Sequence, residues 1–217
     1  MRRCAFTLEG EMTFAEHRLL ASTIESQSKR GTHLEIGTAA GGTLCMMLKV
    51  FEPQLRPKFV VVDTMRYFPN QLSTVRRNLR QNGLQDSTVE IRVALSSDAL
   101  IEATEAGETF DFMLIDGSHK IKAVTADLRW TRLLNVGGIV VLHDYCRRFP
   151  GVVLAVNRFL RRNSNYIKID HCESLLILRK VSKSSRAEIA LADELYALAL
   201  HFPLKVLRWF ATKQRRV

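Results

Sequence analysis

The chain has 217 residues, of which 47% are hydrophobic and 25% are charged, and this composition is typical of a soluble globular protein with a sizeable core. Its formal net charge is +10, but the basic residues are dispersed over several predicted elements, so a solvated basic face and a polyanion-binding surface are equally open. No uninterrupted apolar stretch of about 18 residues occurs, which argues against a membrane-spanning helix.

The N-terminal stretch MRRCAFTLEGEMTF lacks the apolar run of a signal peptide, and its acidic residues argue against a transit peptide. The four cysteines (Cys4, Cys45, Cys146 and Cys172) are scattered and show no C-x-x-C spacing. We therefore expect neither a zinc site nor a disulfide framework, and a reducing, cytoplasmic setting.

Five apolar, β-rich runs recur along the chain and alternate with segments of helical periodicity. The runs are HLEIG (33–37), KFVVVD (58–63), VEIRVA (89–94), FDFMLID (110–116) and GIVVLHD (138–144). Because these runs are continuously apolar and separated by helices, they predict a parallel sheet that is covered on both faces.

After Pro150 the pattern predicts one more helix and then two strands, YIKID (166–170) and SLLILRK (174–180). Only three residues separate these strands, so they should pair antiparallel, with His171 and Cys172 in the turn. The sequence thus predicts a doubly wound, Rossmann-like α/β sheet of seven strands, and such folds bind ligands at the carboxyl ends of their strands.

The first strand end carries the sequence LEIGTAAGGT, in which Glu35, Gly37 and Gly41 form an acid-x-Gly-x-x-x-Gly pattern. Glycines between a strand and a helix permit a tight turn and let a ligand approach the backbone. The dinucleotide fingerprint would need a glycine where Ala39 stands. The second strand ends in Asp63, the position of acids that bind ribose hydroxyls.

The fourth strand ends in FDFMLIDGSH, which places Asp116 and His119 three residues apart at its exit. A turn needs the glycine but not both an acid and a base. Each residue has an ordinary reading, Asp116 as a turn cap and His119 as an exposed residue at a helix start. We favour chemistry for both.

These motifs resemble the class I S-adenosylmethionine-dependent methyltransferases, and more narrowly the cephalosporin hydroxylase-like, rhamnosyl and macrolide-sugar O-methyltransferases. The resemblance runs from about residue 9 to residue 180. It is carried by LEIGTAAGGT, VVVD, FDFMLIDGSH, DLRWTRLLNVGGIVVLHDY and ESLLILRK. The third strand departs from the family pattern, because it ends in VALSS where relatives often have Gly-x-Ser.

The resemblance implies roles for individual residues. The methionine and ribose end of the cofactor would be lined by Glu35, Gly37, Thr38, Gly41 and Thr43. Asp63 would hold the ribose diol, Ser96 would lie near the adenine, and Asp116 would also face the cofactor. In metal-dependent relatives, acids after the fourth and fifth strands hold a divalent cation, usually magnesium. The matching residues are Asp116 and Asp144, with His143 beside the second, where some relatives have Glu. His119 would be the general base.

The residue types suit methyl transfer to a hydroxyl without the family argument. An alcohol holds its proton firmly at neutral pH. A cation on Asp116 and Asp144 would polarise the hydroxyl, and an imidazole can accept the proton near neutral pH.

Other residues have two readings each. Trp130 and Tyr145 would wall an acceptor pocket, although Trp130 equally suits core packing. Asp127 would orient His119 or face solvent as an ordinary helix acid. Lys120 would meet an anionic substrate or belong to a solvated helix face.

We divide the chain into a methyltransferase domain at residues 1–181 and a helical, basic C-terminal extension at residues 182–217. Pro203 is expected to split the extension into two helices. The second helix mixes Leu204, Val206, Leu207, Trp209 and Phe210 with Lys205, Arg208, Lys213, Arg215 and Arg216. It suits peripheral contact with an anionic membrane, or packing on the sheet or on a second subunit of a homo-oligomer.

The sequence therefore predicts an S-adenosylmethionine-dependent O-methyltransferase, assisted by a divalent cation, that acts on a hydroxyl of a sugar, glycan or secondary metabolite. An RNA methyltransferase is the rival enzyme class, but the chain lacks an Asn/Asp-Pro-Pro-aromatic motif, and we expect no nucleic-acid partner. A non-catalytic, cofactor-binding scaffold is the third alternative.

Overall fold

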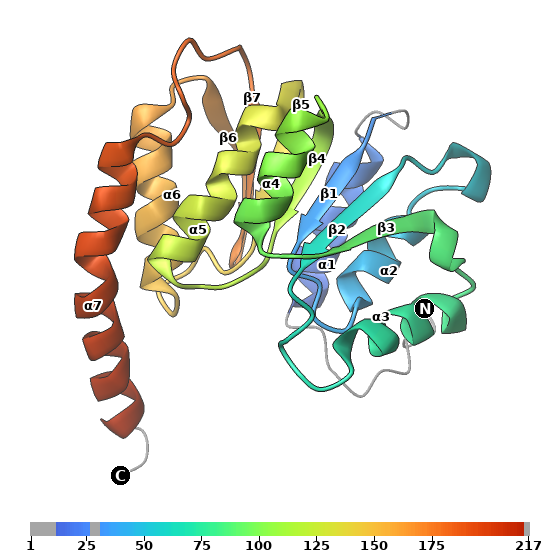
Figure 1. The fold of residues 1–217 in the computed structure, drawn as a ribbon, viewed down its shortest axis with the longest axis horizontal. Coiled ribbons are helices and arrows are strands. Elements are labelled where there is room, and N and C mark those ends of the chain that lie inside the picture. The colour runs from blue at the N-terminus through green and yellow to red at the C-terminus, as the bar shows by residue number, and fades with distance from the viewer. Residues whose placement is uncertain (1–11, 27–30, 215–217) are drawn as a thin grey trace.

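The computed structural model of the chain describes the backbone of residues 12–26 and 31–214. Within them, a seven-stranded sheet lies between helices (Figure 1). The strands are β1 (His33–Ile36), β2 (Phe59–Asp63), β3 (Val89–Val93), β4 (Phe110–Ile115), β5 (Leu134–Leu142), β6 (Tyr166–Cys172) and β7 (Leu175–Lys180). The α-helices are α1 (Phe14–Glu25), α2 (Gly42–Lys49), α3 (Gln71–Gln81), α4 (Ser96–Glu105), α5 (Ile121–Asp127), α6 (Pro150–Arg162) and α7 (Leu191–Gln214). Short 3-10 helices are η1 (Pro53–Leu55), η2 (Asp86–Thr88) and η3 (Leu128–Leu133).

The strand order is β3-β2-β1-β4-β5-β7-β6, which confirms the predicted doubly wound fold. The five strands from β3 to β5 run parallel, and β7 pairs antiparallel with both β5 and β6. The order reverses between β1 and β4, so the connections that leave these two strands diverge to opposite faces. A crevice opens at such a reversal, at the carboxyl ends of the strands.

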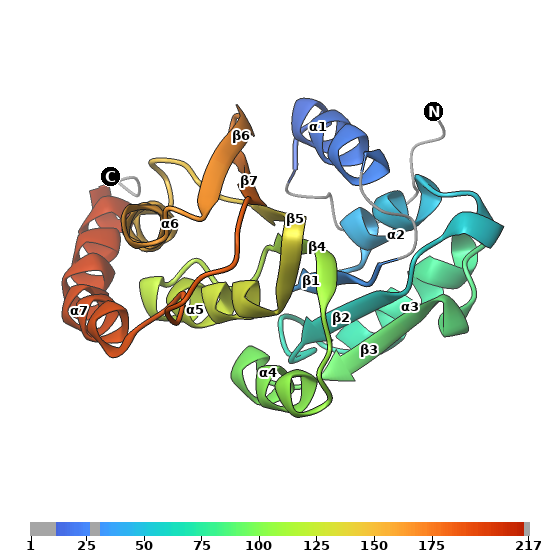
Figure 2. The same ribbon diagram turned by 90° about the horizontal axis from the view of Figure 1, so that it is seen from above.

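The two faces of the sheet bury separate apolar clusters, which explains why the strands read as continuous apolar runs. In β2, Val61 packs with residues of α1, α2 and α3, whereas Val60 and Val62 pack with residues of α4, α5 and α6. Figure 2 shows α1 and α2 on one side of the sheet, and α4 and α5 on the other. Cys45 belongs to the first cluster and is buried, as expected of a small apolar residue.

The turn between the last two strands lies later in the chain than the sequence predicted. His171 and Cys172 are part of β6, and Glu173 and Ser174 form the connection. Glu173 adopts a positive φ of 53°, which lets two residues reverse the chain. Because the hairpin is this tight, β6 pairs with β7 from Cys172 back to Tyr166, with one irregularity in the register between Lys168 and Asp170.

The predicted break at Pro203 is also wrong, because α7 continues through it. A proline removes one hydrogen bond from a helix interior, but Pro203 is exposed, so water can solvate the freed carbonyl. The helix is anchored at its first turn, where buried Asp193 accepts from Ala190 N at 3.0 Å and pairs with Arg158 and Arg162 at 2.8 and 3.1 Å.

The basic, membrane-facing surface predicted for the tail falls largely outside the described residues. The side chains of residues 207–214 and all of residues 215–217, with Trp209, Arg215 and Arg216 among them, belong to that part, as does Cys4. In the described portion of the chain, no helix has the length and apolar character needed to cross a membrane.

Candidate functional site

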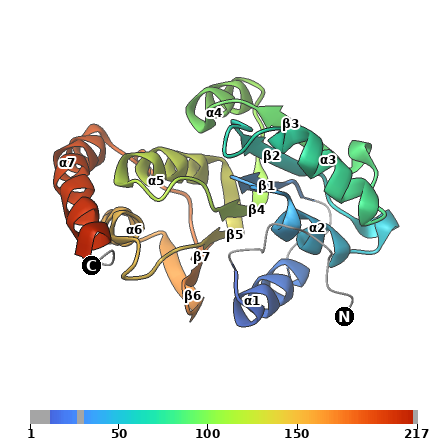
Figure 3. The same cartoon turned by 90° about the horizontal axis from the view of Figure 1, so that it is seen from below.

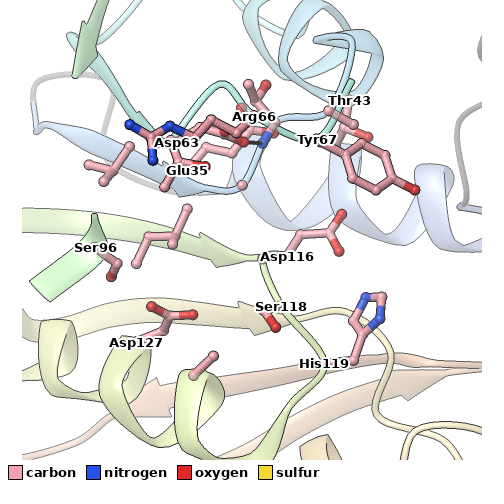
Figure 4. A pocket seen from close by; sticks show the side chains of 18 of the residues that line it. Glu35, Thr43, Asp63, Arg66, Tyr67, Ser96, Asp116, Ser118, His119 and Asp127 are labelled. Atoms are coloured by element: carbon pink, nitrogen blue, oxygen red, sulfur yellow. Dashed lines mark hydrogen bonds between the residues drawn. The ribbon is translucent and has the colours of Figure 1, made fainter. Parts of the chain in front are cut away.

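A cavity of about 760 Å³ lies at the carboxyl ends of β1 to β4, where the strand order predicted a binding site (Figure 4). This volume is within the range of small-molecule sites, roughly 300–1,000 Å³. Of the residues proposed from the sequence, those on its wall are Glu35, Gly37, Thr38, Thr43, Asp63, Ser96, Asp116 and His119. Gly41 is not on this wall and is buried within the loop. Its left-handed φ of 81° turns the chain into α2.

The glycine loop after β1 is pressed against the loop after β4. Gly37 has a φ of 82°, and a Cβ atom there would lie 2.5 Å from the carbonyl oxygen of Asp116 and 2.7 Å from Cα of Gly117. Only glycine fits this position without moving the backbone. Ala39 also has a positive φ, 42°, which an alanine adopts at some cost in conformational energy.

Two side chains of α3 hold the carbonyl groups of this loop. Gln71 Nε2 donates to Ala39 O at 3.0 Å, and Asn78 Nδ2 donates to Ala40 O at 2.7 Å. Both amides are buried, although they lie in a helix that reads as polar. Their spacing of seven residues, which puts them on one helix face, was the signal that sequence reasoning missed.

Asp63 at the end of β2 connects two loops of the cavity. Its Oδ2 accepts from Thr38 N at 2.9 Å, and its Oδ1 accepts from Met65 N at 2.6 Å. Each carboxylate oxygen has a second lone pair, so the side chain can still accept bonds from a ligand diol.

The far end of the cavity contains Ser96 and Asp127, which Figure 4 shows facing each other. Ser96 Oγ accepts from Trp130 Nε1 at 2.9 Å, and Trp130 is fully buried, so it packs in the core rather than on an acceptor pocket. Both sequence interpretations of Asp127 were wrong, because it is buried beside Ser96 and Gly117 and points away from His119. Burial raises the pKa of Asp127 to about 6, although the hydrogen bond with Ser96 acts to lower it.

Glu35 is a buried carboxyl group in β1, and its Oε2 has no hydrogen-bond partner among the described residues. Burial, together with the negative charges of Asp116 and Asp63, raises its pKa to about 8. An unpaired buried acid on a cavity wall costs stability, so it points to a ligand that supplies the missing donor.

Four side chains after β4 and β5 form a contiguous charged cluster. His143 Nδ1 donates to Asp116 Oδ1 at 2.9 Å and lies 3.5 Å from Asp144 Oδ2. His119 Nε2 lies 2.6 Å from the same Asp144 oxygen. Asp144 has a φ of 60°, an uncommon conformation for a non-glycine residue that is concentrated at functional sites. Ligand atoms of Asp116, His143 and Asp144 all lie within 4.8 Å of one another, so they could hold a metal ion.

His143 carries the positive charge that balances this cluster. Burial acts to lower its pKa, but the hydrogen bond and charge of Asp116 and the charges of Asp144 and Glu16 outweigh burial and raise the pKa to about 9. The same burial raises the pKa of Asp116, although the bond from His143 opposes the shift. At neutral pH His143 is therefore an imidazolium, and it lies between Asp116 and Asp144.

Glu16 of α1 is a second buried acid of the site, and sequence reasoning missed it. Its Oε1 accepts from Ser174 N and Oγ at 2.9 and 2.6 Å, and its Oε2 lies 3.8 Å from His143 Nε2. Burial acts to raise its pKa, but the hydrogen bonds from Ser174 and Thr13 lower it. The only local signal is the capping-box spacing of Thr13 and Glu16, which predicts a helix start and not a site.

His119 packs on an aromatic ring at the start of α6. Its ring centroid lies 4.2 Å from that of Phe149. The guanidinium carbon of Arg148 lies over the Phe149 ring, 5.3 Å from the ring centroid. Gly151 allows this approach, because a Cβ atom there would lie 2.6 Å from His119 O. Tyr145 is bonded through its hydroxyl to Asn157 at 2.7 Å. Lys120 is exposed and lies on the cavity wall.

Residues 34–145, which are more than half of the chain, match the model of a family described as a methyltransferase domain. Among curated proteins, the uncharacterized protein R132 of Acanthamoeba polyphaga mimivirus is 27% identical over 148 residues. That match covers 65% of this chain and 63% of R132, so the chain spans less than two thirds of this relative's length.

Several solved structures share the fold. The O-methyltransferase from Bacillus cereus, in complex with SAH, superimposes with a TM-score of 0.64 at 18% identity, over 81% of this chain and 84% of that one. TomG from Streptomyces achromogenes, in complex with SAM, gives 0.61 at 17% identity, over 79% and 82%. CalS11, a TDP-rhamnose 3'-O-methyltransferase, gives 0.59 at 17% identity, over 76% of each chain.

We expect Gly37→Ala to lower the free energy of unfolding by about 2–4 kcal/mol, because the new Cβ atom would force apart the loops after β1 and β4. Gly42→Ala is the matched control, since a Cβ atom there meets open space in the first turn of α2. Its effect should stay within about 0.5 kcal/mol. Urea unfolding measures both, and equal stability of the two variants would show that the loops are not in contact.

Proposed function

The chain belongs to the family of class I S-adenosylmethionine-dependent methyltransferases, and we propose that it methylates a hydroxyl group of a sugar, glycan or other secondary metabolite with the help of a divalent cation. The observation that carries this proposal is the cluster of two acids and two imidazoles. Asp116 and His119 line the cavity beside the glycine loop, and His143 and Asp144 are buried in contact with them, outside its lining.

The inner part of the cavity would hold S-adenosylmethionine. Backbone of the loop at Gly37 and Thr38 lies open to a ligand, Asp63 has lone pairs for a ribose diol, and Ser96 and Asp127 offer polar atoms to an adenine. A cationic amino group would favour the ionised form of Glu35 and supply its missing partner.

The side chains of Asp116, His143 and Asp144 fit a divalent cation, provided that His143 is deprotonated. Asp116, His143 and Asp144 would supply two oxygens and one nitrogen, and bound there a cation would lower the pKa of an acceptor hydroxyl. His143 must first lose the proton that it shares with Asp116, so metal and proton compete for one site. An imidazole in the donor set suits a transition ion such as Mn²⁺ or Zn²⁺ better than it suits Mg²⁺.

His119 is the group that would remove the proton of the acceptor hydroxyl. Its Nε2 lies 2.6 Å from Asp144 Oδ2, so Nδ1 is the ring nitrogen that would accept the proton. Packing on Phe149 fixes the plane of the ring, so the base is positioned before the acceptor binds.

The two alternative functions, an RNA methyltransferase and a non-catalytic cofactor-binding scaffold, would each need a different site from this one. An RNA methyltransferase would gather the basic residues around the cavity. Here Arg66 and Lys120 line it, whereas other cations lie elsewhere, with Arg158 and Arg162 on α6 and Lys58 before β2. A scaffold without activity would have no use for the paired acid and imidazole at 2.6 Å.

We expect S-adenosylmethionine to bind with a micromolar dissociation constant, about −8 kcal/mol. Asp63→Ala should weaken binding by about 1–3 kcal/mol, because the variant loses both a ligand acceptor and the anchor of Thr38 N. Asp98→Ala, an exposed acid at the start of α4, is the control and should bind as the wild type does. Calorimetry that finds no binding of the cofactor, but tight binding of a nicotinamide dinucleotide, would sink this assignment.

His119→Ala should lower turnover by roughly 10²–10⁴-fold, the contribution of a positioned general base, and leave cofactor affinity unchanged. The loss should shrink at high pH, where hydroxide replaces the base. His171→Ala removes an exposed imidazole from β6 and serves as the control.

Chelation of divalent cations should abolish turnover and leave the affinity for the cofactor unchanged. Full activity in chelator would contradict metal assistance, and full activity of His119→Ala would assign the base elsewhere.

Metal affinity should rise with pH, because His143 is protonated below its pKa of about 9 and must be neutral to bind a cation. Titration with Mn²⁺ should show about a tenfold gain in affinity per pH unit from pH 7, levelling off above pH 9. His143→Glu should remove this dependence and shift preference toward Mg²⁺. It should also be less stable in chelator than with Mg²⁺, since it gathers carboxylates without a cation. Affinity that does not change with pH would show that His143 is not a ligand.

A further inference from the structure

The outward face of α7 carries a row of apolar side chains that the rest of the chain leaves uncovered. Leu191, Leu195, Leu198 and Phe202 are 70%, 57%, 55% and 71% exposed. We call these four residues the α7 stripe. Figures 1 and 3 show α7 at the outer edge of the molecule, beyond α5 and α6. An aligned row of this kind marks an interaction surface, unlike scattered exposed leucines.

The inward face of α7 already has its partners. Ala197 is buried in the core cluster with α5 and α6, Tyr196, Leu200 and Leu204 pack against the same cluster, and Asp193 is bonded to Arg158. The stripe is therefore a second apolar face, and docking α7 onto its own domain cannot bury it.

The spacing of the stripe points to a second copy of the same chain. Successive members lie four, three and four residues apart, which is a coiled-coil pattern that reads the same in both directions. We propose that two chains dimerise through their α7 helices in antiparallel orientation, about a two-fold axis between residues 196 and 197. Leu191 of one copy then meets Phe202 of the other, and Leu195 meets Leu198, so that every layer is apolar.

The residues beside the stripe fit this pairing. Ala192 and Ala199 are exposed on the same face and, in the antiparallel register, come opposite each other. Such small side chains permit close approach of two helix axes. No described residue covers either alanine.

Charge distinguishes a second copy from a membrane as the occupant. Glu194 forms an ion pair with Arg129 of its own chain, and the antiparallel register brings Glu194 beside His201 of the other copy. An anionic lipid surface would instead meet an acid at the first turn of the stripe. Within the described side chains, the exposed face of α7 offers such a surface only Lys205.

The area of the interface between the two α7 stripes limits the affinity of the dimer. A standard interface buries roughly 800 Å² per partner, and a single pair of short helical stripes falls below that. We expect a dissociation constant in the micromolar range, about 1–100 µM.

The test is the oligomeric state of the full chain, measured by sedimentation velocity across this concentration range. Leu195→Glu and Leu198→Glu, each made singly, should raise the dissociation constant by about 30-fold or more, as for central residues of an interface. Ile101→Glu is the matched control, because Ile101 is 56% exposed on the helix α4 and lies outside the stripe. Circular dichroism and cofactor binding should be unchanged in all three variants.

Substitutions at His201 test the antiparallel register. His201→Lys should tighten the dimer by about 1.5- to 5-fold by facing Glu194 of the other copy, and His201→Glu should weaken it by a similar factor. A parallel pair would place residue 201 of one copy beside Val206 of the other, away from Glu194, so the two substitutions would not change the affinity in opposite directions.

Three results would overturn the proposal. The wild type could remain a monomer throughout the concentration range. A dimer could form that ignores Leu195→Glu and Leu198→Glu, which would place the interface elsewhere. A monomer could bind vesicles of anionic lipid in a way that the same substitutions abolish, which would make the membrane the occupant.

Discussion

The backbone of Gly37 lies against the backbone of Asp116 and Gly117, at the point where the sheet reverses its strand order. This contact requires a glycine at position 37, and it fixes the distance between the glycine loop and the acid that follows β4. Asp63 then ties Thr38 N to the loop after β2. The wall of the cavity is thus set by backbone contacts, and side chains need only fill positions that the backbone has already placed.

The buried charges depend on the same arrangement. Asp116, Asp144 and Glu16 are acids around one imidazole, and burying such a group is costly unless each charge is paired. His143 pairs with Asp116, while Glu16 is satisfied by Ser174 and Thr13. The helix α1 and the β6–β7 turn are therefore part of the electrostatics of the site, although both lie far from the glycine loop in sequence. Under the proposed function, a cation that enters the site would have to replace the imidazolium charge, which would link metal binding to pH.

The C-terminal helix illustrates how one element can have two roles. Its inner face packs on α5 and α6, and α5 begins two residues after His119, so α7 supports the segment that carries the proposed base. Its outer face is the α7 stripe. Pairing of two chains there would stabilise the outermost layer of the domain at a distance from the cavity, so oligomeric state and chemistry can be varied separately.

The sequence by itself determined the fold and the placement of the acids. Continuous apolar runs required a sheet covered on both faces, and parallel strands bring Asp63, Asp116 and Asp144 to one edge. The tertiary structure alone decided what surrounds them. Glu16, Gln71 and Asn78 lie in helices whose local pattern is that of ordinary surface, and only packing turns them inward. The protonated state of His143 and the burial of Asp127 likewise follow from neighbours that are distant in sequence, because desolvation and Coulomb interactions depend on spatial distance and not on spacing along the chain.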